Sequence, residues 1–221
     1  MRRIEAVAIG AAAALWLLMA GRFVIAADWS ARLGGAVLLA CAAGALVADL
    51  LSGVVHFFCD RFFSERTPLI GRAFITPFRE HHRDPAGIAR HDFWDRNGNN
   101  CIALLPLLIA AHAAFDVEGL RLHASALQAW LLAGCASAAA TNEIHAWAHG
   151  ARAPAIARRL QHAGLILSPQ AHQRHHTGGH THAYCITTGW CNRVLDGLAA
   201  FAALEIAIRC AGRALRGRRV P

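Results

Sequence analysis

Long apolar stretches alternate with polar, histidine-bearing segments along this chain. The four apolar stretches cover about residues 4–20, 33–58, 101–117 and 124–147. A membrane-crossing helix needs roughly 20 apolar residues, so the second and fourth stretches are long enough and the first is barely so. The third is shorter and contains Pro106 and His112, which indicates a tilted, kinked or re-entrant segment. We therefore expect an all-α, polytopic membrane helical bundle with about four transmembrane helices.

Two polar segments, residues 59–100 and 150–194, separate and follow these stretches. Within the first, residues 76–84 are expected to form one short helix, because Pro77 suits a first helical turn and Asp84 precedes a proline. Residues 97–100, Asn-Gly-Asn-Asn, are expected to form a polar loop that leads into the third span.

The composition supports a membrane protein. Hydrophobic residues make up 56% of the chain and charged residues only 16%, whereas a typical soluble domain is about 25% charged. The net charge of +8 suits either nucleic acid or a membrane surface; the apolar stretches favour the membrane, and no nucleic-acid motif is present. The seven cysteines are odd in number and contain no C-x-x-C pair, so we expect reduced thiols.

Arginine placement predicts the topology. Of the 22 basic residues, all of them arginine, only Arg22, Arg32 and Arg121 lie in the loops after the first and third spans. The positive-inside rule then places both termini and both polar segments in the cytoplasm, where they would form a histidine-rich cap on one membrane face. Ala20-Gly21-Arg22 is a poor cleavage site, so the first stretch is expected to be a retained helix.

Histidine is concentrated in this expected cap. Neutral imidazole is a common ligand for iron and zinc. We expect eight metal ligands, which are His56, His81, His82, His145, His149, His172, His175 and His176. Asp60, His91 and His180 are further possible ligands or partners of ligands, whereas His112 and His123 fall toward the opposite membrane face and are excluded.

Spacing supports these ligands. In a helix, positions i, i+3 and i+4 share one face, so His172, His175 and His176 would converge. His145 and His149 are an i,i+4 pair, as are His56 and Asp60. Adjacent residues diverge by about 100° on a helix, so His81 and His82 are expected to serve two neighbouring metals.

Eight imidazoles exceed the four ligands that one zinc ion takes, which favours two metals. Nitrogen donors alone do not distinguish iron from zinc. Ala146 stands where a zinc protease has the glutamate of H-E-x-x-H, and neither a G-x-S-x-G elbow nor a nucleotide-binding glycine motif is present. A paired iron centre at the bilayer surface would suit oxygen-dependent attack on a C–H bond of a lipid chain.

The motifs resemble those of the Kua/plasmanylethanolamine desaturase family. They occur in the same order and include Asp49-x-x-Ser-Gly-x-x-His56-x-x-x-Asp60, His81-His82-x-Asp84-Pro85, Arg90-His91-Asp92-Phe93, Asn142-x-x-His145-x-x-x-His149, His172-x-x-His175-His176 and Tyr184-Cys-Ile-Thr-Thr-Gly-Trp190-x-Asn192. The chain departs from the family where Ala171 replaces a further histidine and where the tail from Arg213 is basic. The resemblance implies a lipid desaturase domain over residues 45–206, between an N-terminal transmembrane region (1–44) and a basic tail (207–221).

The resemblance also implies a function. The eight histidines would hold two irons that use dioxygen to form the vinyl ether of plasmalogens from an alkyl-ether (plasmanyl) phospholipid. The chain has no cytochrome or ferredoxin-like cysteine motif, so the electrons would come from a separate protein that is cytochrome b5-like or ferredoxin-like. An acyl-chain desaturase and a hydroxylase with the same centre stay open, and a zinc-dependent membrane hydrolase or a metal carrier is a more distant alternative.

Overall fold

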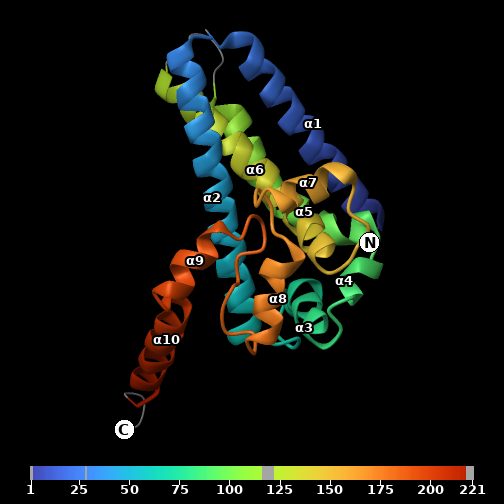
Figure 1. The fold of residues 1–221 in the computed structure, drawn as a ribbon, viewed down its shortest axis with the longest axis vertical. Helices are drawn as coiled ribbons and strands as arrows, with labels where there is room; N and C mark the ends of the chain where they lie inside the picture. The colour runs from blue at the N-terminus through green and yellow to red at the C-terminus, as the bar shows by residue number, and fades with distance from the viewer. Residues whose placement is uncertain (1, 28, 116–121, 218–221) are drawn as a thin grey trace.

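The computed structural model describes residues 2–27, 29–115 and 122–217, and this part of the chain is helical without strands. Four long helices form the body of the molecule (Figure 1): α1 (Arg2–Ala26), α2 (Ala31–Arg61), α5 (Phe93–Ala114) and α6 (Leu122–Ala148). The shorter elements are η1 (Gly71–Ile75), α3 (Thr76–Arg83), α4 (Gly87–Arg90), α7 (Ala155–His162), α8 (Pro169–Thr177), α9 (Trp190–Gly197) and α10 (Ala200–Gly217). The all-α prediction is therefore confirmed for the described residues.

Close helix packing organises the bundle, with α2 against α6 and α1 against α5. Gly44 of α2 permits one of these contacts, because a Cβ atom there would lie 2.2 Å from the Trp130 carbonyl oxygen and 2.9 Å from the Gly134 nitrogen. Gly98 of α5 likewise permits the contact with α1, because a Cβ atom there would lie 2.5 Å from the Glu5 side chain. Small residues at both crossings let the backbones approach closely.

Two of the described helices, α1 and α2, are long and apolar enough to cross a membrane. The helices α5 and α6, which contain the third and fourth predicted spans, lie beside them in the same bundle (Figure 1). The structure thus supports membrane association, while the crossing of all four helices stays a prediction. Residues 116 and 117 of the predicted third span lie outside the described residues.

The polar loop predicted at residues 97–100 is wrong, because these residues belong to α5. The helix begins at Phe93, and the Asp92 carboxylate caps it by accepting hydrogen bonds from the backbone nitrogens of Trp94 and Asp95. The asparagines are stable within the helix because their amides face α6: Asn97 donates to the Glu143 carboxylate and Asn100 donates to the Ala138 carbonyl. Tertiary contacts therefore outweigh the local turn preference of Asn-Gly-Asn-Asn.

The short helices α3 and α8 gather around one end of the bundle, where α2 and α6 also end (Figure 1). Helix α10 projects from this end. It is attached to α2 by Arg61, which donates two hydrogen bonds of 2.9 and 2.8 Å to the Glu205 carboxylate. The predicted helix at residues 76–84 is confirmed as α3, which ends before Asp84.

A buried carboxylate ties the loop before α9 to the middle of α2. Asp49 is fully buried, and its Oδ1 accepts from the backbone nitrogens of residues 187, 188 and 189, at 3.2, 2.8 and 2.9 Å. Its Oδ2 accepts from the Cys191 nitrogen at 3.0 Å, and the hydroxyl of Ser52, one turn along α2, accepts from the Ile186 nitrogen. This anchoring holds the segment 183–189 against the histidine-bearing end of α2.

Candidate metal centre

The eight histidines expected as ligands come together in the cap. One lies on α2, two on α3, one near the end of α6, one directly after α6, and three on α8, and their rings contact one another across these elements. The structure therefore brings together histidines that lie up to 120 positions apart in the sequence, from His56 to His176.

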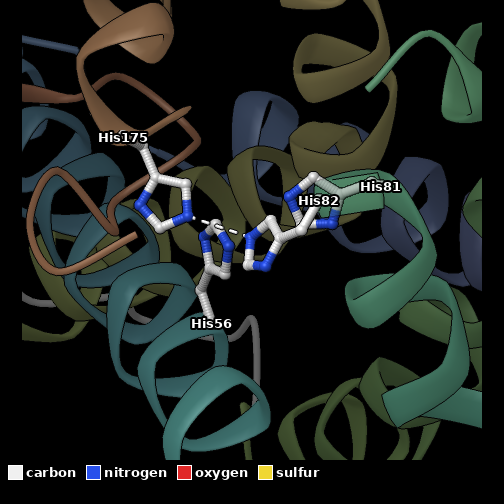
Figure 2. Close-up of side chains that lie close together, drawn as sticks. All are labelled: His56, His81, His82 and His175. Atoms are coloured by element: carbon white, nitrogen blue, oxygen red, sulfur yellow. Dashed lines mark hydrogen bonds between the residues drawn. The ribbon is translucent and has the colours of Figure 1, made fainter. Parts of the chain in front are cut away.

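One group of donor atoms belongs to His56, His81, His82 and His175, whose ligand atoms all lie within 4.8 Å of one another. Figure 2 shows these rings turned toward a common point, with His56 on α2, the adjacent pair on α3 and His175 on α8. The Nε2 atoms of His82 and His175 are 3.1 Å apart.

A second group contains His81, His149, His172 and His176, again with ligand atoms within 4.8 Å of one another. His172 Nε2 is central, at 2.8 Å from His149 Nε2 and 3.1 Å from His176 Nε2. His145 joins this group through its own Nε2, which lies 2.9 Å from that of His172 and 3.1 Å from that of His149. His81 belongs to both groups, so the two groups adjoin.

These contacts have the geometry of a coordination shell more than of a hydrogen-bond network. An imidazole nitrogen carries either one proton or one lone pair, so His172 Nε2 cannot form three separate hydrogen bonds to three Nε2 atoms. Two nitrogens that each lie about 2.0–2.1 Å from a metal ion are about 2.9 Å apart at a 90° angle and about 3.4 Å apart at a tetrahedral angle. The observed separations of 2.8–3.1 Å fall near the lower of these values.

Backbone carbonyls orient two of the rings. The Nδ1 atom of His56 lies 3.0 Å from the Tyr184 carbonyl oxygen, and the Nδ1 atom of His175 lies 2.7 Å from the His182 carbonyl oxygen. A carbonyl only accepts, so Nδ1 carries the proton in both rings and Nε2 keeps its lone pair. A hydrogen bond from Nδ1 to a backbone carbonyl fixes both the tautomer and the orientation of the ring.

The environment also favours the neutral, ligating form of the imidazoles. Burial, followed by the charge of neighbouring His180, lowers the pKa of His82 to about 2. Burial and neighbouring His175 lower the pKa of His176 to about 4, and burial lowers that of His175 to about 4. These rings are therefore neutral at pH 7, as metal binding requires.

The other residues considered from the sequence take different positions. The Asp60 carboxylate faces the first group, with Oδ2 3.4 Å from His56 Nε2. His180 stacks on His82 with ring centroids 3.9 Å apart but belongs to neither group of donors. His91 lies outside both groups and is 55% exposed, 3.9 Å from Asp95. His112 lies away from the cap, beside Met19 and Gln128, and the His123 side chain lies outside the described residues.

Sequence reasoning did not assign a role to the residues that support the cluster from behind. The Tyr184 carbonyl that orients His56 is held in place by Asp49, as described above. The spacing of Asp49, Ser52, Gly53 and His56 on one face of α2 is the sequence feature that could have indicated this support. Gly53 allows the chain at Cys185 to lie close to α2, because a Cβ atom there would lie 2.4 Å from the Cys185 sulfur.

A cavity of about 360 Å³ adjoins the cluster on the α3–α4 side. Its lining includes His81, the histidine common to both groups, together with Glu80, Arg83, Arg90 and His91. Pockets of about 300–1,000 Å³ are typical of small-molecule sites. The cavity thus has His81 in its wall, beside both positive and negative side chains.

Comparison with known proteins decides the family. A family model described as the lipid desaturase domain matches residues 45–216. The chain belongs to the lipid desaturase domain family. The resemblance inferred from the motifs is confirmed, and the two histidine groups are consistent with the metal centre of a desaturase.

Several curated members of the lipid desaturase family are similar to this chain. Plasmanylethanolamine desaturase of Myxococcus xanthus is 40% identical over 183 residues, covering 80% of this chain and 63% of that protein. Plasmanylethanolamine desaturase 1 of Mus musculus is 42% identical over 174 residues, covering 76% and 64%. Fatty acid desaturase 4, chloroplastic, of Arabidopsis thaliana is 34% identical over 170 residues, covering 76% and 50%.

The chain therefore spans less than two thirds of the length of each of these three relatives. No solved structure matches it significantly.

Proposed function

We propose that this chain is a membrane desaturase that forms the vinyl ether double bond of plasmalogens from alkyl-ether (plasmanyl) phospholipids. The observation that carries the proposal is the pair of adjoining imidazole groups that share His81. Its substrate is suggested by the two plasmanylethanolamine desaturases to which the chain is 40% and 42% identical.

The eight histidines of the cap fit a two-iron centre. Nitrogen donors suit iron, and the donor atoms of His56 and His81 are buried without a hydrogen-bond partner among the described residues, as expected of atoms reserved for a metal. When bound, two irons would supply desaturase chemistry in which dioxygen, two protons and two electrons from a separate reductant, cytochrome b5-like or ferredoxin-like, accept two hydrogens from adjacent carbons and give two waters.

The protein's own contribution is orientation and exclusion of water. The backbone carbonyls of Tyr184 and His182 keep two Nε2 atoms directed at the centre. His56, His172 and His175 are at most 1% exposed, so water has little access on their side. We propose that the substrate approaches from the other side, through the cavity beside His81, whose mixed charges suit a zwitterionic phospholipid headgroup.

We further propose that α1, α2, α5 and α6 all cross the membrane, with the cap and both termini in the cytoplasm. The supporting facts are the apolar character of α1 and α2, the packing of α5 and α6 against them and the distribution of arginine. The cap would then lie at the inner membrane surface, where lipid chains and a soluble reductant can both reach it.

Lipid mass spectrometry tests this function. The chain is expressed in cells that contain plasmanyl but not plasmenyl phospholipids. We expect a product two hydrogens lighter that disappears after acid treatment, because acid cleaves vinyl ethers. His176→Ala should abolish this product while the protein persists in the membrane, and His112→Ala, distant from the cap, should retain it.

Other products would identify the alternatives. Gain of one oxygen would indicate a hydroxylase, and an acid-stable product two hydrogens lighter in an acyl chain would indicate the acyl-chain desaturation suggested by the Arabidopsis relative. An unchanged lipid profile with zinc bound and no need for oxygen would overturn the proposal in favour of a hydrolase or a metal carrier.

A further inference from the structure

Asp60 occupies an unusual position at the metal centre. It lies one turn after His56 on α2, and its side chain is only 2% exposed. Its Oδ2 is 3.4 Å from His56 Nε2 and 3.5 Å from the Nε2 atoms of both His82 and His175. Neither carboxylate oxygen has a hydrogen-bond partner among the described residues. Three of the four donor nitrogens of the first group therefore lie around the carboxylate.

A supporting role behind a ligand does not fit this position. A carboxylate that orients a histidine ligand contacts the ring nitrogen that points away from the metal. In His56 and His175 that nitrogen is Nδ1, which already donates to a backbone carbonyl. Asp60 instead faces the Nε2 atoms, which are the atoms that face one another. Its oxygen consequently stands among the donor atoms.

The charge of Asp60 also requires a partner. A buried carboxylate is costly unless it is paired or coordinates a metal. Within the part of the chain that the structure describes, the groups at ion-pair distance from it are three of the four imidazoles of the first group. A bound cation at this position would pair with the carboxylate.

We infer that Asp60 is itself a metal ligand, which makes the two metal positions chemically unequal. One position takes His56, His82, His175 and the Asp60 carboxylate. The other takes only imidazoles, which are His145, His149, His172 and His176, and His81 lies between the two. This inference rests on the proposed function, because it assumes the two-metal centre.

The inequality has a chemical consequence. An anionic, hard oxygen donor stabilises a more highly charged metal ion than neutral imidazole does. The iron beside Asp60 is thus the one expected to be more readily held in the ferric state. The two irons should be distinguishable in the resting protein.

Substitution of Asp60 tests the inference with readouts other than activity. Full-length protein is purified in detergent, loaded with ⁵⁷Fe, and measured for iron per chain and for Mössbauer spectra. We expect two irons and two different quadrupole doublets in the wild type. In Asp60→Asn, which keeps the size and removes the charge, iron should fall to about half and one doublet should disappear. Asp95→Asn, an exposed carboxylate outside the cluster, should match the wild type.

Asp60→Glu covers the case in which Asp60→Asn does not fold. It keeps the carboxylate, so iron should stay near the wild-type amount while the parameters of one doublet shift and those of the other do not. Wild-type iron content and two unchanged doublets in either Asp60 variant would overturn the inference. Absence of two irons from the wild-type protein would instead count against the proposed function.

Discussion

Asp49 offers the strongest test of how the fold supports the centre. Its fully buried carboxylate accepts four backbone hydrogen bonds from the segment 187–191, at 2.8–3.2 Å. This segment follows Tyr184, whose carbonyl orients His56. We expect Asp49→Ala to destabilise the protein strongly and also to weaken metal binding at the first group.

The magnitude follows from the four donors. A buried N–H group left without an acceptor costs about 1–3 kcal/mol, so four such groups would cost about 4–12 kcal/mol if nothing replaced the carboxylate. Entering water and relaxation of the loop reduce this cost, so we expect a loss of at least about 4 kcal/mol in the free energy of unfolding. Asp49→Asn keeps an oxygen for the three Oδ1 bonds but places an NH₂ group against the Cys191 nitrogen, and should cost about 2 kcal/mol.

The assay is denaturant-induced unfolding in detergent micelles, followed by tryptophan fluorescence on the metal-free protein, with iron content measured separately. Asp84→Asn is the matched control, because that carboxylate is exposed and forms an ion pair with Arg90 at the surface. It should change the free energy of unfolding by less than about 0.5–1 kcal/mol. A loss below about 1 kcal/mol in Asp49→Ala would refute the anchoring role.

Two further predictions concern packing and pH. Gly44→Ala should lower the free energy of unfolding by about 2–3 kcal/mol, since the new Cβ would lie 2.2 Å from the Trp130 carbonyl oxygen. Gly35→Ala is the control, because the space around its Cβ is open. Equal stability of the two variants would contradict the close crossing of α2 and α6. The metal-free protein should lose thermal stability as the pH falls from about 6.5 to about 4, because the pKa values of His82 and His176 are lowered from 6.5 to about 2 and about 4, so the unfolded chain binds more protons over this interval. A melting temperature that does not change between pH 7 and pH 5 would contradict the burial of neutral imidazoles.

Much of the fold could be predicted from periodicity and length. Each of the four apolar stretches forms a helix over its described residues, except for Phe115 at the end of the third, and the spacing of His172, His175 and His176 does place them on one helix, α8. Local rules failed at residues 97–100, because the amides of Asn97 and Asn100 find partners on α6, which follows about 40 residues later in the chain. A polar run is locally indistinguishable from a loop until those partners are known.

The sequence by itself determined the family, the helical class and the set of imidazoles, because spacing within a helix dictates which side chains share a face. Only the tertiary structure decided how those imidazoles divide into two adjoining groups, that His81 belongs to both, and that the Asp60 carboxylate faces Nε2 atoms. These relations depend on distances between α2, α3, α6 and α8, which are set by the glycine-mediated contact of α2 with α6 and by the anchoring of the 183–189 segment at Asp49. Such distances arise from packing between segments far apart in the chain, which local spacing does not encode.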